Sequence, residues 1–137
     1  METITLNKKT TNVELLRRGY EAFNNGDIAT LNEIFADDCS WHTPGKSPIA
    51  GKHKGKDNVF AQFGKYGAET NGTFKAILKN IAVCDDGTIV TIHRNTAERN
   101  GKKLDVDCCL VFEFRDGQAI SGKEFFFDLN NWDDFWN

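Results

Sequence analysis

Several features that would assign this protein to a familiar class are missing from its 137 residues. No apolar run approaches the roughly 18 residues that a membrane-spanning helix needs, and the polar residues 1–10 lack the apolar segment of a secretory signal. The formal net charge of −3 argues against nucleic-acid binding, which needs a basic surface. No glycine-rich phosphate loop, nucleotide fingerprint or GxSxG nucleophile occurs. The length of 137 residues fits one globular domain, long enough to bury a core without disulfides.

Cysteine and histidine are too few and too unfavourably spaced to indicate a metal site. The four cysteines form no CxxC pair, and the three histidines show no HxH or HExxH spacing. Cys108 and Cys109 are adjacent in an expected strand, so they point to opposite faces. We interpret the cysteines as small buried thiols in a reducing cytoplasm, and we expect no metal and no other cofactor.

The N-terminal half has helical periodicity. After residues 1–10, which we expect to form a flexible leader, apolar side chains recur at steps of three and four through residues 13–23, and an Asn-Asn-Gly sequence ends this pattern. Shorter helices are predicted over 28–35 and 57–67, each preceded or begun by an aspartate that can cap it. Aromatic residues at helical spacing near the C-terminus indicate a final turn that needs packing to be stable.

The C-terminal half predicts a sheet. Three turn signals of the Asp-Gly or Asn-Gly type separate runs rich in β-branched and aromatic residues. The four runs cover residues 73–84, 88–99, 102–115 and 118–127. Short turns between long strands predict a four-stranded antiparallel meander, and helices followed by strands indicate an α+β fold.

Alternation along the strands identifies one inner face and leaves another undecided. In 102–115 one face is apolar throughout and must look toward the helices, whereas Cys109 and Val111 on the other face form a plausible centre for a dimer contact. In 88–99 the same reasoning places Val90 and Ile92 inside and His93 outside, but periodicity alone does not decide this strand.

Short segments in a fixed order resemble the SnoaL-like branch of the NTF2-like superfamily. They are GYEAFNNGD at 19–27, FADD at 35–38, WHTPG at 41–45, AERNG at 97–101 and FRDG at 114–117. The resemblance covers nearly all of residues 11–137 and implies one domain, in which three N-terminal helices cover a strongly curved antiparallel sheet around a conical pocket. It also implies a homodimer through the outer face of the sheet.

The superfamily includes ketosteroid isomerases, polyketide cyclases, scytalone dehydratase and limonene-epoxide hydrolase. The isomerase residues do not carry over: the tyrosine's place falls at Gly19, with Tyr20 one step away, the catalytic base's at Thr43 and the protonated acid's at Leu110. The sequence therefore argues against steroid isomerisation by that mechanism.

The same resemblance places His93, Asn95 and Arg99 on the pocket side, together with Glu124 and Asp128. Asp128 matches the acid/base aspartate of SnoaL-like cyclases. The catalytic candidates are His93, Asp128 and Glu124, because histidine titrates near neutrality and a carboxyl in apolar surroundings has a raised pKa. The candidate substrate-binding residues are Trp41, His42, Asn95, Arg99, Phe126 and Leu110.

Two functions fit these residues. The first is a small cofactor-free enzyme that isomerises, cyclises or dehydrates an apolar carbonyl-bearing or cyclic metabolite, with His93 and Asp128 as the acid/base pair and Glu124 as the alternative. The second is a non-catalytic ligand-binding or dimerisation module of the same fold, in which His93 is simply a sheet histidine bonded to a neighbour. Neither involves nucleic acid or a membrane.

Overall fold

The computed structural model describes the backbone of residues 2–137 and the side chains of residues 11–137. Its elements are α1 (Glu2–Asn25), α2 (Ile28–Ile34), β1 (Phe35–Thr43), β2 (Gly51–Lys54), α3 (Lys56–Ala68), β3 (Lys75–Val83), β4 (Ile89–Arg99), β5 (Lys102–Arg115), β6 (Gln118–Phe126) and α4 (Leu129–Trp136). Helix α1 begins earlier than the periodicity predicted, because no glycine or proline interrupts it. The flexibility of a leader stays a prediction, since Met1 and the side chains of residues 2–10 lie outside the described part.

The six strands form one sheet in the order β2-β1-β6-β5-β4-β3. The predicted meander is confirmed as β3 to β6, and positive φ angles at Asn100 and Asp116 make its last two turns as tight as their sequences predicted. Two details differ from the expectation. Strand β1 pairs with β6 in parallel, and a further strand, β2, folds back antiparallel on β1.

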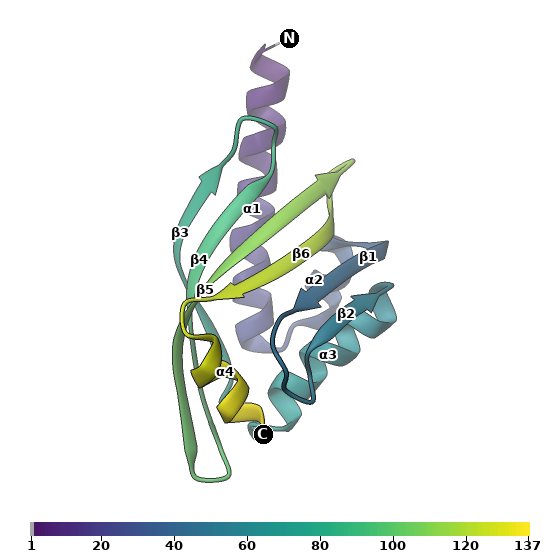
Figure 1. Cartoon of the computed structure of the whole chain (residues 1–137). Helices are drawn as coiled ribbons and strands as arrows, with labels where there is room; N and C mark the ends of the chain where they lie inside the picture. Colours follow the sequence, from purple (N-terminus) through teal and green to yellow (C-terminus); the bar gives the residue numbers. More distant parts are fainter. Residues whose placement is uncertain (1) are drawn as a thin grey trace.

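The sheet is curved and open, and the helices α1, α2 and α3 lie on one side of it (Figure 1). Register shifts interrupt the pairing in β1, β3 and near the end of β5, and such irregularities let a strand bend. Together these elements give the α+β, NTF2-like architecture that the sequence predicted. Among the described helices, none is long and apolar enough to cross a membrane.

The inner face of the sheet carries polar as well as apolar side chains. The apolar face of β5, from Leu104 to Phe112, is buried as predicted. In β4 the buried residues include Thr91, His93 and Asn95, while Val90 and Ile92 are partly exposed on the other face. The interpretation by alternation was therefore wrong for β4, and the one based on family resemblance was right.

The C-terminal helix α4 closes one end of the structure. Trp132 and Trp136 are fully or almost fully buried and pack against Tyr66 and Phe74. Trp132 also stacks on Phe126 with a centroid separation of 3.8 Å. This packing supplies the stability that so short a helix lacks on its own.

Candidate functional site

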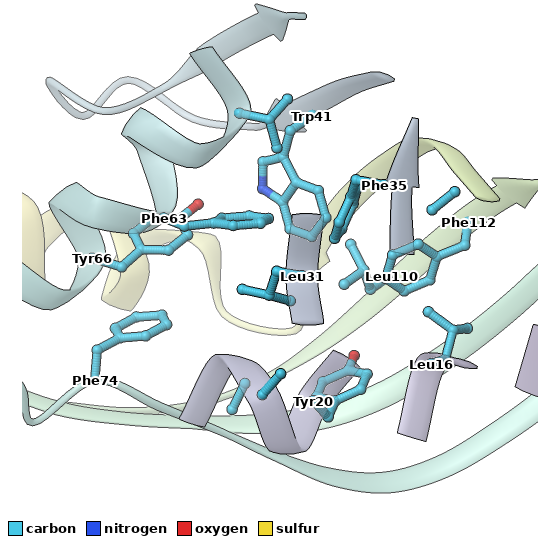
Figure 2. Close-up of a cluster of buried hydrophobic side chains, with 14 of the residues drawn as sticks. Leu16, Tyr20, Leu31, Phe35, Trp41, Phe63, Tyr66, Phe74, Leu110 and Phe112 are labelled. Carbon is cyan, nitrogen blue, oxygen red and sulfur yellow. The ribbon is translucent and has the colours of Figure 1, made fainter. Parts of the chain in front are cut away.

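A cavity lies between the helices and the concave face of the sheet. Its volume is about 60 Å³. This is room for roughly four to six water molecules. Most of its wall is apolar, and Figure 2 shows side chains from α1, α2, α3 and the strands around the same space. The polar residues that line it are Tyr20, Tyr66, His93, Asn95, Glu124 and the indole of Trp41.

Glu124 is the acidic residue of this wall. It projects from β6, its side chain is buried, and one carboxyl oxygen, Oε1, accepts three hydrogen bonds. Thr43 Oγ1 donates over 2.7 Å, the Tyr66 hydroxyl over 2.8 Å and Trp41 Nε1 over 3.1 Å. Within residues 11–137 the structure gives the other oxygen, Oε2, no hydrogen bond. The hydrogen bonds to this carboxyl therefore all fall on one of its two oxygens.

The surroundings of Glu124 move its titration to neutral pH. Burial raises the pKa of its carboxyl to about 7, because the charged form loses its hydration, while the hydrogen bonds from Thr43, Tyr66 and Trp41 act in the opposite direction. Among residues 11–137, no lysine or arginine lines the cavity to stabilise the charged form. A carboxyl with this pKa can both take up and release a proton near neutrality.

His93 lies in a second hydrogen-bonded chain on the same wall. Its Nδ1 is 2.7 Å from the Tyr20 hydroxyl, and its Nε2 is 2.9 Å from Asn95 Oδ1. Tyr20 in turn is 2.6 Å from Thr91 Oγ1, and Asn95 Nδ2 donates to the carbonyl of Lys75. Both ring nitrogens of His93 are therefore occupied.

The backbone carbonyl of Lys75 fixes the direction of this chain. Because a carbonyl only accepts, the NH₂ end of Asn95 faces it and the amide oxygen faces His93. His93 then carries its hydrogen on Nε2, and its Nδ1 accepts from Tyr20. Burial lowers the pKa of His93 to about 4, so the ring is neutral at pH 7. One amide hydrogen of Asn95 stays without a partner among the described residues.

Asp128 lies elsewhere. Its side chain is exposed, caps the N-terminus of α4 by accepting from Asn131 N over 3.1 Å, and is not part of the cavity wall. The expectation that Asp128 faces the pocket beside His93 does not fit this position. The acidic residue that shares the cavity with His93 is Glu124.

The predicted substrate-binding residues fall into two groups. Trp41, Asn95 and Leu110 line the cavity. His42 is half-buried outside it, and Phe126 is stacked on Trp132. Arg99 donates to the carbonyl of Phe135 at the end of α4 and pairs with Glu69 at 3.7 Å, so it anchors the C-terminal helix.

Sequence reasoning missed three polar residues that complete the site: Tyr66, Gln62 and Thr43 in its role as a donor. Tyr66 and Gln62 lie on α3, and only the apolar spacing of that helix was visible in the sequence. Thr43 is the position matched to the isomerase base, and here it donates to Glu124 instead. The carboxyl beside this position belongs to Glu124 of the neighbouring strand β6.

A family model for the SnoaL-like domain matches residues 16–121, most of the chain. The chain belongs to the SnoaL-like family. The uncharacterized protein Rv0034 of Mycobacterium tuberculosis is 34% identical over 124 residues, which cover 90% of this chain and 95% of the relative.

Solved structures place this SnoaL-like protein among NTF2-like folds. Bal32a, from a soil-derived mobile gene cassette, is 58% identical, with a TM-score of 0.94 over 95% of this chain and 99% of that one. An NTF2-like protein of unknown function from Burkholderia pseudomallei is 20% identical, with a TM-score of 0.81 over 93% and 98% of the two chains. The second likeness concerns the fold alone.

Proposed function

We propose that this SnoaL-like protein is a small acid/base enzyme of the isomerase, cyclase or dehydratase type, working without a cofactor. The observation that carries the proposal is the state of Glu124: a buried carboxyl in an apolar cavity, held through Oε1, free at Oε2, and with a pKa of about 7. Perturbed groups of this kind concentrate at catalytic sites.

The lining defines the substrate that suits this site. Because the wall is mostly apolar and no cationic side chain of the described residues lines it, we infer a small, neutral, apolar molecule. A carbonyl group would match the unpartnered amide hydrogen of Asn95, and an acidic C–H bond next to that carbonyl would face Glu124. The cavity volume favours a single ring or a short chain.

The proposed reaction begins with proton transfer. Glu124 Oε2 takes a proton from the carbon beside the carbonyl, and the electron pair of the broken C–H bond moves onto the carbonyl oxygen as an enolate. Asn95 Nδ2–H donates to that oxygen, since preformed donors stabilise developing negative charge. The protonated Glu124 then returns its proton to a carbon atom of the substrate. His93 acts as a positioning residue in this scheme, because its Nε2–H holds the amide oxygen of Asn95.

The test follows proton abstraction directly, with cyclopentanone as the probe. Nuclear magnetic resonance in D₂O measures exchange of the hydrogens beside its carbonyl, and the wild-type protein should accelerate this exchange. Glu124→Gln should abolish the acceleration, whereas Asp128→Asn should leave it unchanged. Equal loss in Asp128→Asn would instead support the aspartate that the family resemblance indicated, and no acceleration by the wild type would refute proton abstraction from this ketone.

The second candidate is a ligand-binding or dimerisation module without catalysis. The observation that favours it is the complete hydrogen bonding of His93, which serves binding and structure as well as chemistry. This function would be supported if cyclopentanone raised the melting temperature of the protein while the hydrogens beside its carbonyl exchanged no faster than without protein. In either case we propose a homodimer through the outer face of the sheet.

A further inference from the structure

Gln62 lies behind the hydrogen-bonded carboxyl of Glu124, outside the cavity wall. It is 1% exposed, and its amide nitrogen Nε2 is 2.9 Å from the carbonyl oxygen of Ile49. The same nitrogen is 3.1 Å from Thr43 Oγ1 and 3.2 Å from the Tyr66 hydroxyl. Because the Ile49 carbonyl only accepts, the amide must present its NH₂ end to all three oxygens.

This arrangement controls the direction of two hydroxyl hydrogens. Thr43 and Tyr66 carry one hydroxyl hydrogen each, and their oxygens are 3.0 Å apart, close enough to bond to each other. If they did so, one of the two hydroxyl hydrogens would be used in that bond and would no longer be available to Glu124. The amide of Gln62 supplies a hydrogen to this pair from behind, which frees both hydroxyl hydrogens to turn toward Glu124 Oε1.

We propose that Gln62 is a positioning residue, which orients the hydroxyls of Thr43 and Tyr66 toward Oε1 of Glu124 and thereby keeps Oε2 directed to the ligand. This inference rests on the proposed role of Glu124, but it concerns the carboxyl itself and can be tested without a substrate. Loss of the amide should let Thr43 and Tyr66 bond to each other. Glu124 then loses one donor, and its charged form is less stabilised.

Other titratable groups around Glu124 do not obscure this measurement. Those facing it or sharing its cavity are Tyr20 of α1, Tyr66 of α3, His93 of β4 and Cys108 of β5. Burial raises the pKa of both tyrosines and of the cysteine above their usual values, and it lowers that of His93 to about 4. Between pH 5 and 8, the carboxyl of Glu124 is the group of this set expected to titrate.

The experiment is a double-mutant cycle on Gln62→Met and Thr43→Val, with the pKa of Glu124 as its readout. Carbon-13 resonance of the Glu124 side-chain carboxyl gives this pKa, and Glu124→Gln assigns the signal. Each single variant removes one donor from Oε1 and should raise the pKa by about one unit, as expected for one hydrogen bond to a charged group. The double variant should show no further rise, because Tyr66 then has no hydroxyl partner and donates to Glu124 again.

Additive shifts in the double variant, or an unchanged pKa in Gln62→Met, would overturn the inference, since a role in packing alone predicts no such coupling. Neutron diffraction of the wild-type protein gives a second measurement if Gln62→Met does not fold. The Tyr66 and Thr43 hydroxyl hydrogens should both point to Glu124 Oε1, and a hydrogen between Thr43 and Tyr66 would contradict the proposal. A coupled pKa shift in a protein that does not accelerate exchange in cyclopentanone would retain the inference and refute only proton abstraction from this ketone.

Discussion

Trp41 and Gly122 face each other across the parallel pair of β1 and β6, and the indole ring lies directly over the bare Cα of the glycine. A Cβ at position 122 would collide with two ring carbons. The same ring reaches Glu124 two residues along β6, where its Nε1 donates to Oε1. The absence of a side chain at Gly122 therefore determines how the tryptophan meets the carboxyl.

Gly122→Ala is expected to displace Trp41 and lower stability by about 1–3 kcal/mol, the usual cost of overpacking a core. Urea unfolding measures this loss, and the pKa of Glu124 should rise because one of its donors moves away. Gly64→Ala in α3 is the matched control, since nothing lies within 4 Å of its added Cβ. Equal stability of the two variants would contradict the importance of the close approach at Gly122.

Glu124 should make the protein less stable as pH rises. Its pKa is about 7 in the folded state against 4.5 as the ordinary value, so the folded chain retains a proton that the unfolded chain releases. The protonated carboxyl contributes about 3 kcal/mol to the free energy of unfolding. This contribution is complete below pH 4.5 and is lost as pH rises through 7. Urea unfolding of the wild type and Glu124→Gln between pH 5 and 8 should show the variant gaining relative stability with pH. Parallel curves would mean that the carboxyl titrates normally.

His93 should have the opposite effect. Its pKa is about 4 when folded against 6.5 as the ordinary value, so the unfolded chain takes up a proton that the folded chain does not. Stability from this group is complete above pH 6.5 and is lost as pH falls to about 4, again about 3 kcal/mol. In Glu124→Gln, the free energy of unfolding measured against pH shows this dependence without the contribution of the Glu124 carboxyl. Adding His93→Gln should remove the dependence. A slope that persists in the double variant would assign the acid sensitivity to another group.

Asp128 is expected to affect stability through its cap on α4. Asp128→Ala removes the acceptor for Asn131 N and should cost about 1 kcal/mol. Asp128→Asn retains a side-chain oxygen and should be nearly neutral, because asparagine caps helices as well as aspartate does. Thermal unfolding of both variants distinguishes these outcomes. A large loss in Asp128→Asn would show that the charge, rather than the cap, matters.

The strands, turns and apolar faces were predictable because each depends on local chemistry. Asn-Gly and Asp-Gly adopted the tight turns, and the apolar face of β5 was unambiguous. Strand β4 was not, since alternation shows which residues share a face but not which face is covered. His93 is inside because Tyr20 and Asn95 satisfy its two nitrogens. The pairing with Tyr20 spans 73 residues of sequence and leaves no local signal.

Asp128 lies away from the cavity for a related reason. Asp128 and Glu124 share a strand face by counting, but β6 ends at Phe126 and the chain turns into α4. The periodicity of a strand no longer applies past that point. Likewise, Gln62 and Tyr66 occupy an ordinary helical pattern, and only the approach of α3 to β1 brings them to Thr43.

Phe125 provides the test of the homodimer. It is 52% exposed on the outer face of β6, opposite Cys109 on β5, which in turn pairs with Ile92 on β4. Within the described chain Phe125 is exposed, while Cys109 and Ile92 are partly buried. We expect a second copy to cover this apolar stripe, because exposed apolar patches commonly mark interfaces. Sedimentation should show a dimer for the wild type and a monomer for Phe125→Glu. Ile28→Glu, an equally exposed change on α2, should leave the dimer intact. A dimer that survives Phe125→Glu would place the interface elsewhere.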